Sequence, residues 1–175
     1  MKQINYYILE RLHINKNIDS YNYHPKTNPE LYELVGKLIK ERGNDANLND
    51  IDTSEITDMS ALFYYSSFNG DISNWNVSNV KYMNRIFSYS KFNGDISNWN
   101  VSNVYDMNHM FDNSKFNGDI SKWNVNNVEN MYCMFFGSEF NGDISNWDVS
   151  NVINMELMFY NSPLEKNPPK WYKKK

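Results

Sequence analysis

The chain has 175 residues, of which 41% are hydrophobic and 16% aromatic, and this content excludes a wholly disordered chain. Its formal net charge of −4 is unevenly spread: residues 44–163 carry 15 acidic and 5 basic side chains, a balance that argues against a nucleic-acid groove. A single cysteine, Cys133, excludes an internal disulfide framework and a cysteine-rich zinc site.

Residues 1–43 are interpreted as a helical N-terminal cap. Apolar residues at helical spacing predict a first amphipathic helix, and the segment 21–23 predicts a short edge strand that Pro25 ends. A second helix is expected to have Asn28 as N-cap, Pro29 at its first position and Gly43 after its end. The alternative is that this segment docks on a partner. The apolar stripes are Ile4, Ile8, Leu9 and Leu12 in the first helix, and Leu31, Leu34, Val35, Leu38 and Ile39 in the second.

The opening residues contain Glu10 and Arg11 where a signal peptide needs an unbroken apolar stretch, and no run of about 18 apolar residues occurs. We therefore expect no signal peptide and no membrane span, and a cytoplasmic or virion-associated protein.

A repeat of 24 residues begins near residue 44 and predicts five stacked coils. Each unit is too small to bury its own aromatic rings, so stacking on neighbours is expected to form the core. The coils are expected near residues 44–67, 68–91, 92–115, 116–139 and 140–163, with 164–175 as a partial coil and basic tail. The tryptophans that mark the interval are Trp75, Trp99, Trp123, Trp147 and Trp171.

Within each unit the pattern of apolar residues changes halfway. Residues 71–77 suggest a short strand after an Asn-Gly turn. Val80, Met83, Ile86 and Phe87 then form one helical stripe, with Ser78 as the expected N-cap. The sequence therefore predicts an α/β solenoid of strand-helix coils with one parallel sheet.

The string F-N-G-D-I-S-x-W-x-V-S-x-V-x-x-M-x-x-M-F resembles the repeat of BspA-like surface proteins and mycoplasma lipoproteins. The resemblance covers Leu48 to about Phe159, and four full copies share nearly every anchor residue. Similar repeats occur in gut Bacteroidetes and their phages. The resemblance implies a right-handed, leucine-rich-repeat-like stack that binds other macromolecules and has no enzymatic role. The surface proteins of that family are exported, whereas no signal peptide is expected here.

The positions that differ between copies predict where a partner binds, because exposed aromatic rings often anchor protein interfaces. The alternative is that some of these rings fold over the coil ends as additional core. The candidate partner-binding residues are Tyr64, Tyr65, Tyr82, Tyr89, Tyr105, His109, Tyr132, Phe136 and Tyr160.

No catalytic residue, metal ligand or cofactor is expected, since no nucleophile has a base placed beside it and no phosphate-binding loop occurs. One aspartate per coil forms a column, in which turn N–H groups are the expected partners and a cation ladder is the alternative. The column consists of Asp71, Asp95, Asp119 and Asp143.

The function expected from these observations is a non-enzymatic protein-interaction or structural module, part of a larger assembly such as a phage virion. Two alternatives stay open: an intracellular acidic inhibitor that imitates nucleic acid, and a cell-surface adhesin.

Overall fold

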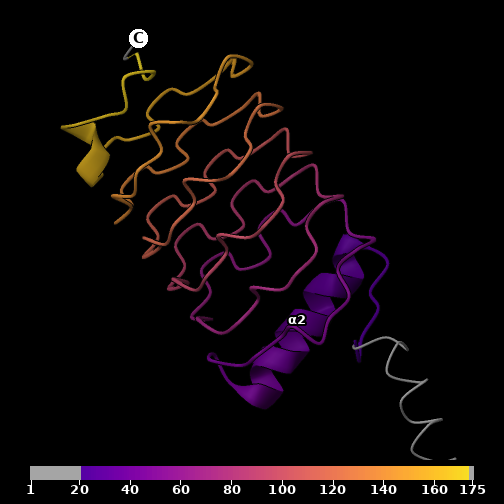
Figure 1. Ribbon diagram of the computed structural model, residues 1–175. Helices are drawn as coiled ribbons and strands as arrows, with labels where there is room; N and C mark the ends of the chain where they lie inside the picture. The colour runs from indigo at the N-terminus through magenta and orange to yellow at the C-terminus, as the bar shows by residue number, and fades with distance from the viewer. Residues whose placement is uncertain (1–20, 174–175) are drawn as a thin grey trace, which may run out of the picture.

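The segment Asn28–Arg42 forms the helix α2, close to the sequence-based prediction. The computed structural model describes residues 21–173. The N-cap of α2 is Thr27, one residue before the expected Asn28, and its side chain accepts a hydrogen bond from the Glu30 N–H. Leu31, Val35 and Leu38 are buried, so α2 covers one end of the molecule with its apolar stripe (Figure 1).

Of the other two parts of the expected cap, only the edge strand lies within the described residues. The helix predicted from Ile4 to Leu12 lies outside the described residues. At the predicted edge strand, the structure has only a single parallel bridge between Tyr23 and Ile51. Arg42 joins α2 to the first coil, because its guanidinium contacts both Asp50 oxygens at 3.0 Å and the ring of Tyr23 at 5.6 Å.

Beyond α2 the chain winds in coils that lie side by side, with α2 at one end and the C-terminal segment at the other (Figure 1). Rings 24 residues apart stack on one another. Trp75 and Trp99 have centroids 6.5 Å apart with an interplanar angle of 2°, and Phe68 and Phe92 are 6.3 Å apart at 3°. These columns, together with buried valine, isoleucine and methionine, make one continuous hydrophobic core.

The prediction of an α/β solenoid built from strand-helix coils is wrong. Among residues 21–173, α2 is the only α-helix, and the coils are joined by isolated parallel bridges and not by a sheet. The bridges along the second half of the coils join Asp58, Tyr82, Asp106, Asn130 and Asn154, each to the next.

The helix expected at 80–87 does not form because its backbone N–H groups bind the neighbouring coil. Met83 N–H donates to the Asp106 carbonyl at 2.9 Å, and Phe87 N–H donates to the Met110 carbonyl at 3.0 Å. The residues between them make four-residue turns, as in the bond from Ile86 N–H to the Met83 carbonyl. Such turns also bury residues at i, i+3, i+6 and i+7, so the helical stripe was a correct indicator of burial and a wrong indicator of the backbone.

The expected N-cap role of Ser78 is wrong for the same reason. Its N–H and hydroxyl donate to the Asn76 side chain, at 3.1 and 2.7 Å, and close a local turn. The next residue, Asn79, makes the link between coils, since its side-chain amide donates to the Ser54 carbonyl at 2.7 Å. Equivalent bonds at 2.7 Å follow from Asn103, Asn127 and Asn151.

The C-terminal segment is half a coil. The 3-10 helix η2 (Pro163–Glu165) places Leu164 in the core, and Trp171 stacks on Trp147 at 6.5 Å. The Trp171 indole N–H donates to the Ile144 carbonyl at 2.9 Å, and each earlier repeat tryptophan makes the same kind of bond. The tail therefore continues the tryptophan side of the stack for one further step.

Candidate functional site

Each coil has a constant strip and a variable strip. The constant strip comprises residues 69–80, 93–104, 117–128 and 141–152, which are nearly identical between copies. The variable strip comprises residues 57–67, 81–91, 105–115, 129–139 and 153–163. All nine predicted partner-binding residues lie on the variable strip.

Three of them form a tyrosine cluster at its N-terminal end. Tyr65 stacks on Tyr89 with ring centroids 4.5 Å apart, and Tyr64 meets Tyr65 edge to face at 4.6 Å. Tyr65 is 63% exposed. The pKa of its phenol is raised, first by lost hydration and then by the neighbouring Tyr64 and Tyr89. The cluster is therefore a surface of packed aromatic rings in contact with water.

His109 lies in a polar cluster in the middle of the strip. Its Nδ1 is 2.8 Å from Asp112 Oδ2, and the Asn113 amide donates to Asp112 Oδ1 at 2.5 Å. Asp112 is only 8% exposed, and the Tyr132 ring meets the imidazole edge to face at 5.2 Å. His109 itself is half-buried in a left-handed turn.

The remaining candidates form one pair and two single rings. Phe136 stacks on Tyr160 at 5.2 Å, and Phe136 is half-buried. Tyr82 and Tyr105 are exposed and have no ring partner in the part of the chain that the structure describes. The nine residues thus share one strip but do not form a single aromatic patch.

Asp112 and Asn113 were missed by the sequence-based reasoning. Asp112 stands in a column otherwise occupied by Tyr64, Ser88, Phe136 and Tyr160. A carboxylate in a column with three aromatic residues is the signal that could have identified it. Next to it, Gly137 has a φ of +60°, and a Cβ there would lie 2.5 Å from Asn113 Oδ1. The Asn113 side chain thus occupies the space that the missing Cβ leaves.

We expected the aspartate column to accept hydrogen bonds from N–H groups of the Asn-Gly turn, but the partners are different. Asp71 Oδ1 accepts the N–H of Ser73 at 3.0 Å, two residues further along, and the other three aspartates repeat this turn. That N–H donor is the main cause that lowers the pKa of Asp71, Asp95, Asp119 and Asp143. The column is therefore ionised at neutral pH.

Two other features bear on chemistry. Cys133 is buried, and lost hydration is the main cause that raises the pKa of its thiol, so the reactive thiolate is disfavoured. Within residues 21–173, no group of three or more histidine, cysteine, aspartate or glutamate side chains is placed to hold a metal ion. In that same range, no helix has the length and hydrophobicity to cross a membrane.

Comparison with known proteins gives one family. The family model described as "Mycoplasma protein of unknown function, DUF285" matches residues 34–137 and, in a second overlapping placement, residues 90–175. Two overlapping matches are what a repeat produces, since the model can align in more than one register. No curated protein and no solved structure matches the chain.

Proposed function

The chain belongs to the DUF285 family of mycoplasma repeat proteins, and we propose that it is a non-enzymatic module that binds another protein through its variable strip. The observation that carries this proposal is the tyrosine cluster of Tyr64, Tyr65 and Tyr89. These rings are 41%, 63% and 42% exposed although each contacts another ring of the cluster. Fixed tyrosines lose little side-chain freedom on binding, so they are effective interface anchors.

The contrast between the two strips supports this assignment. The constant strip repeats tryptophan and asparagine side chains that bond coil to coil, whereas the variable strip carries a different set of exposed side chains in every coil. Variation confined to one strip supplies specificity without disturbing the stack. The F-N-G-D-I-S-x-W motif resembles the BspA-like repeat. On this resemblance we extend the proposal to a module that is part of a larger assembly.

The test is capture of the partner from the native source with the immobilised chain. The variant Tyr64→Ala/Tyr65→Ala/Tyr89→Ala removes the three rings, and we expect it to lose most of the captured partner. The matched control is Asn74→Ala/Asn98→Ala/Asn146→Ala, which changes three exposed side chains of the constant strip.

Unfolding by urea establishes that both triple variants fold before capture is compared. Equal capture by the tyrosine variant and the native chain would reject the tyrosine cluster as the binding surface. Loss of capture by the asparagine variant alone would move the surface to the constant strip.

A second candidate function, an acidic inhibitor that imitates nucleic acid, is favoured by the ionised aspartate column. The four carboxylates recur at one position per coil on the constant strip and keep their charge at neutral pH. Under this alternative, Asp95→Asn/Asp119→Asn would lower partner capture and the capture by the native chain would fall steeply with salt. Salt-independent capture that survives this double substitution would reject the alternative.

A further inference from the structure

The second half of each coil is held to the next coil by a row of backbone bonds that run in one direction. In the coil 116–139, the N–H groups of Met131, Cys133 and Phe135 donate to carbonyls of the following coil at 2.7, 3.0 and 2.9 Å. The same row occurs in each of the three preceding coils. Each coil therefore presents a line of backbone N–H donors, and the neighbouring coil accepts their hydrogen bonds with the carbonyls of every second residue.

In the coil 140–163 this row has no partner. The equivalent donors are the N–H groups of Met155, Leu157 and Phe159, and none of them has an acceptor within residues 21–173. The Ile153 carbonyl, just before these donors, also accepts no backbone hydrogen bond within residues 21–173. The equivalent Glu129 carbonyl of the preceding coil accepts two. We call residues 153–159 the open edge.

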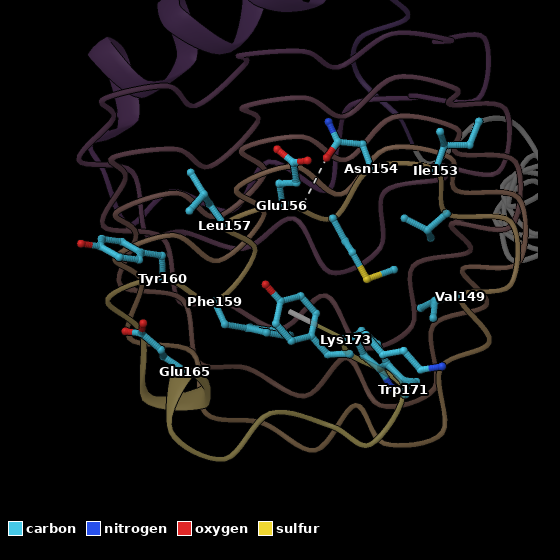
Figure 2. Close-up of a pocket in the computed structure, with 13 residues that line it drawn as sticks. Val149, Ile153, Asn154, Glu156, Leu157, Phe159, Tyr160, Glu165, Trp171 and Lys173 are labelled. Carbon is cyan, nitrogen blue, oxygen red and sulfur yellow. Dashed lines mark hydrogen bonds between the residues drawn. The ribbon is translucent and has the colours of Figure 1, made fainter. Parts of the chain in front are cut away.

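The apolar side chains beside the open edge lack their cover as well. Val149, Val152 and Met155 are half-buried, whereas the equivalent Val125, Val128 and Met131 are buried in the preceding coil. A pocket of about 860 Å³ lies over them. Figure 2 shows Ile153, Leu157, Phe159 and Trp171 around this pocket.

The C-terminal tail covers only part of this end. Trp171 extends the tryptophan column by one ring. The Asn161 N–H donates to Glu165 Oε2 at 2.9 Å. In the preceding coil, the equivalent Gly137 N–H donates to the Tyr160 carbonyl of the next coil. The tail thus replaces the neighbouring coil at the far end of the row. It also buries Phe159 beneath Tyr172, whose ring centroid lies 4.9 Å away, whereas the Met155 and Leu157 N–H groups lie on the part of the edge that the tail leaves open.

We propose that the open edge binds a coil segment with the V-x-x-M-x-x-M-F pattern, supplied by another chain that carries this repeat. The same interface between coils is formed four times within this chain, and it indicates what the open edge can bind. The partner must offer carbonyls at alternate residues to the N–H groups of the edge and apolar side chains to the pocket. This surface is separate from the tyrosine cluster and does not depend on the function proposed above.

A second copy stacked head to tail does not fit this edge. Its first coil offers matching carbonyls at residues 58, 60 and 62, which accept no backbone bond in the described part of the chain. However, α2 packs on that coil with Leu31, Val35 and Leu38 buried. The helix therefore occupies the space that the last coil of the other copy would need, and the segment must come from a coil without such a cap.

The experiment measures amide hydrogen exchange by NMR on the full chain. The probe is a synthetic peptide with the sequence of residues 104–114, VYDMNHMFDNS, whose equivalent carbonyls receive the row from the coil 68–91. We expect the amides of Met155 and Leu157 to exchange rapidly in the free chain and to slow by at least about tenfold with peptide. The amides of Cys133 and Phe135 are protected throughout and report on the integrity of the fold.

The control peptide carries asparagine in place of Met107, Met110 and Phe111 and is expected to give no protection. In the chain, Ile153→Asp changes a side chain that is 77% exposed and lines the pocket, and it is expected to weaken the protection by the native peptide. The proposal is overturned if the amides of Met155 and Leu157 stay unprotected at millimolar peptide. Protection already present in the free chain, or protection that grows with protein concentration alone, overturns it too, because the edge is then covered by this chain or by a second copy.

Discussion

Left-handed backbone recurs at two positions of every coil in the described residues, and the first of them is the column that begins with Ala61. Ala61, Arg85, His109, Cys133 and Leu157 have φ between +52° and +58°. A Cβ in this region meets the following carbonyl, at a cost of roughly 1–2 kcal/mol per residue. The column nevertheless holds five different side chains, so the turn geometry is imposed by the bonds between coils and not by the residue type.

The exposed Arg85 allows this geometry to be tested. Arg85→Gly removes the Cβ penalty, and we expect it to be more stable to urea than Arg85→Ala by about 1 kcal/mol. If residues 80–87 formed a helix, the order would be reversed, because glycine destabilises a helix interior by about 0.5–1 kcal/mol relative to alanine. Arg85→Ala is the control for the loss of the guanidinium.

The aspartate column predicts a dependence of stability on pH. The Ser97 and Ser121 N–H groups lower the pKa values of Asp95 and Asp119 in the folded chain. A folded-state pKa below that of the unfolded chain means that the ionised carboxylate stabilises the fold above about pH 4, and that this stabilisation is lost as the pH falls through the folded-state value.

Asp95→Asn/Asp119→Asn should therefore lose less stability than the native chain between pH 7 and pH 3, measured by urea unfolding at each pH. The turn itself survives, because the Asn76 side chain already accepts the Ser78 N–H in this chain. Asp45→Asn is the control, since Asp45 is exposed and has no partner within the described residues. Equal acid sensitivity of the double variant and the native chain would contradict the assigned role of the serine N–H groups.

The tryptophan column determines how firmly successive coils are joined. Trp99 is 3% exposed and its indole N–H donates to the Ile72 carbonyl at 3.2 Å. Trp99→Phe removes one of the two donors to that buried carbonyl, which also accepts the Trp75 N–H at 3.2 Å. The lost hydrogen bond costs about 0.5–1.5 kcal/mol of unfolding free energy in addition to the lost packing. Trp171→Phe removes the equivalent bond at a half-buried position, where water can replace the donor. Urea unfolding should show a clearly smaller loss for Trp171→Phe, and an equal loss would show that burial does not set the cost.

The elements differ in how well the sequence predicts them. The helix α2 was predicted to within one residue at its N-cap, because proline, an apolar stripe and a following glycine are local signals. The backbone of the coils was not, because the bonds of Met83 and Phe87 reach a residue 23 positions ahead. Local periodicity showed which side chains are buried, but the competition between a helix and a row of bonds to the next coil is decided outside the segment.

The candidate site shows the same division between local and distant information. The exposed rings of Tyr64 and Tyr65 could be identified from the variation between copies, and their contact is between adjacent residues. The stacking of Tyr65 on Tyr89 and the contact of His109 with Tyr132 depend on the distance between coils. The open edge could not be predicted at all, since it is defined by where bonds between coils stop.

For the molecule as a whole, a stack in which each coil contacts only its neighbours predicts stability that depends on position. Met107 and Met155 occupy the same column, but Met107 is fully buried between two coils and Met155 is half-buried at the open edge. Met107→Ala should therefore cost about 2–5 kcal/mol of unfolding free energy. Met155→Ala should cost half of that or less, because it exposes less additional apolar surface.

The two substitutions remove the same atoms from the same repeat position, so their difference isolates the contribution of the covering coil. Urea unfolding followed by tryptophan fluorescence measures both variants. Equal losses would mean that the open edge is already covered in solution. If the repeat peptide 104–114 restores the cost of Met155→Ala to that of Met107→Ala, the missing contacts at this end are those that one coil makes with the next.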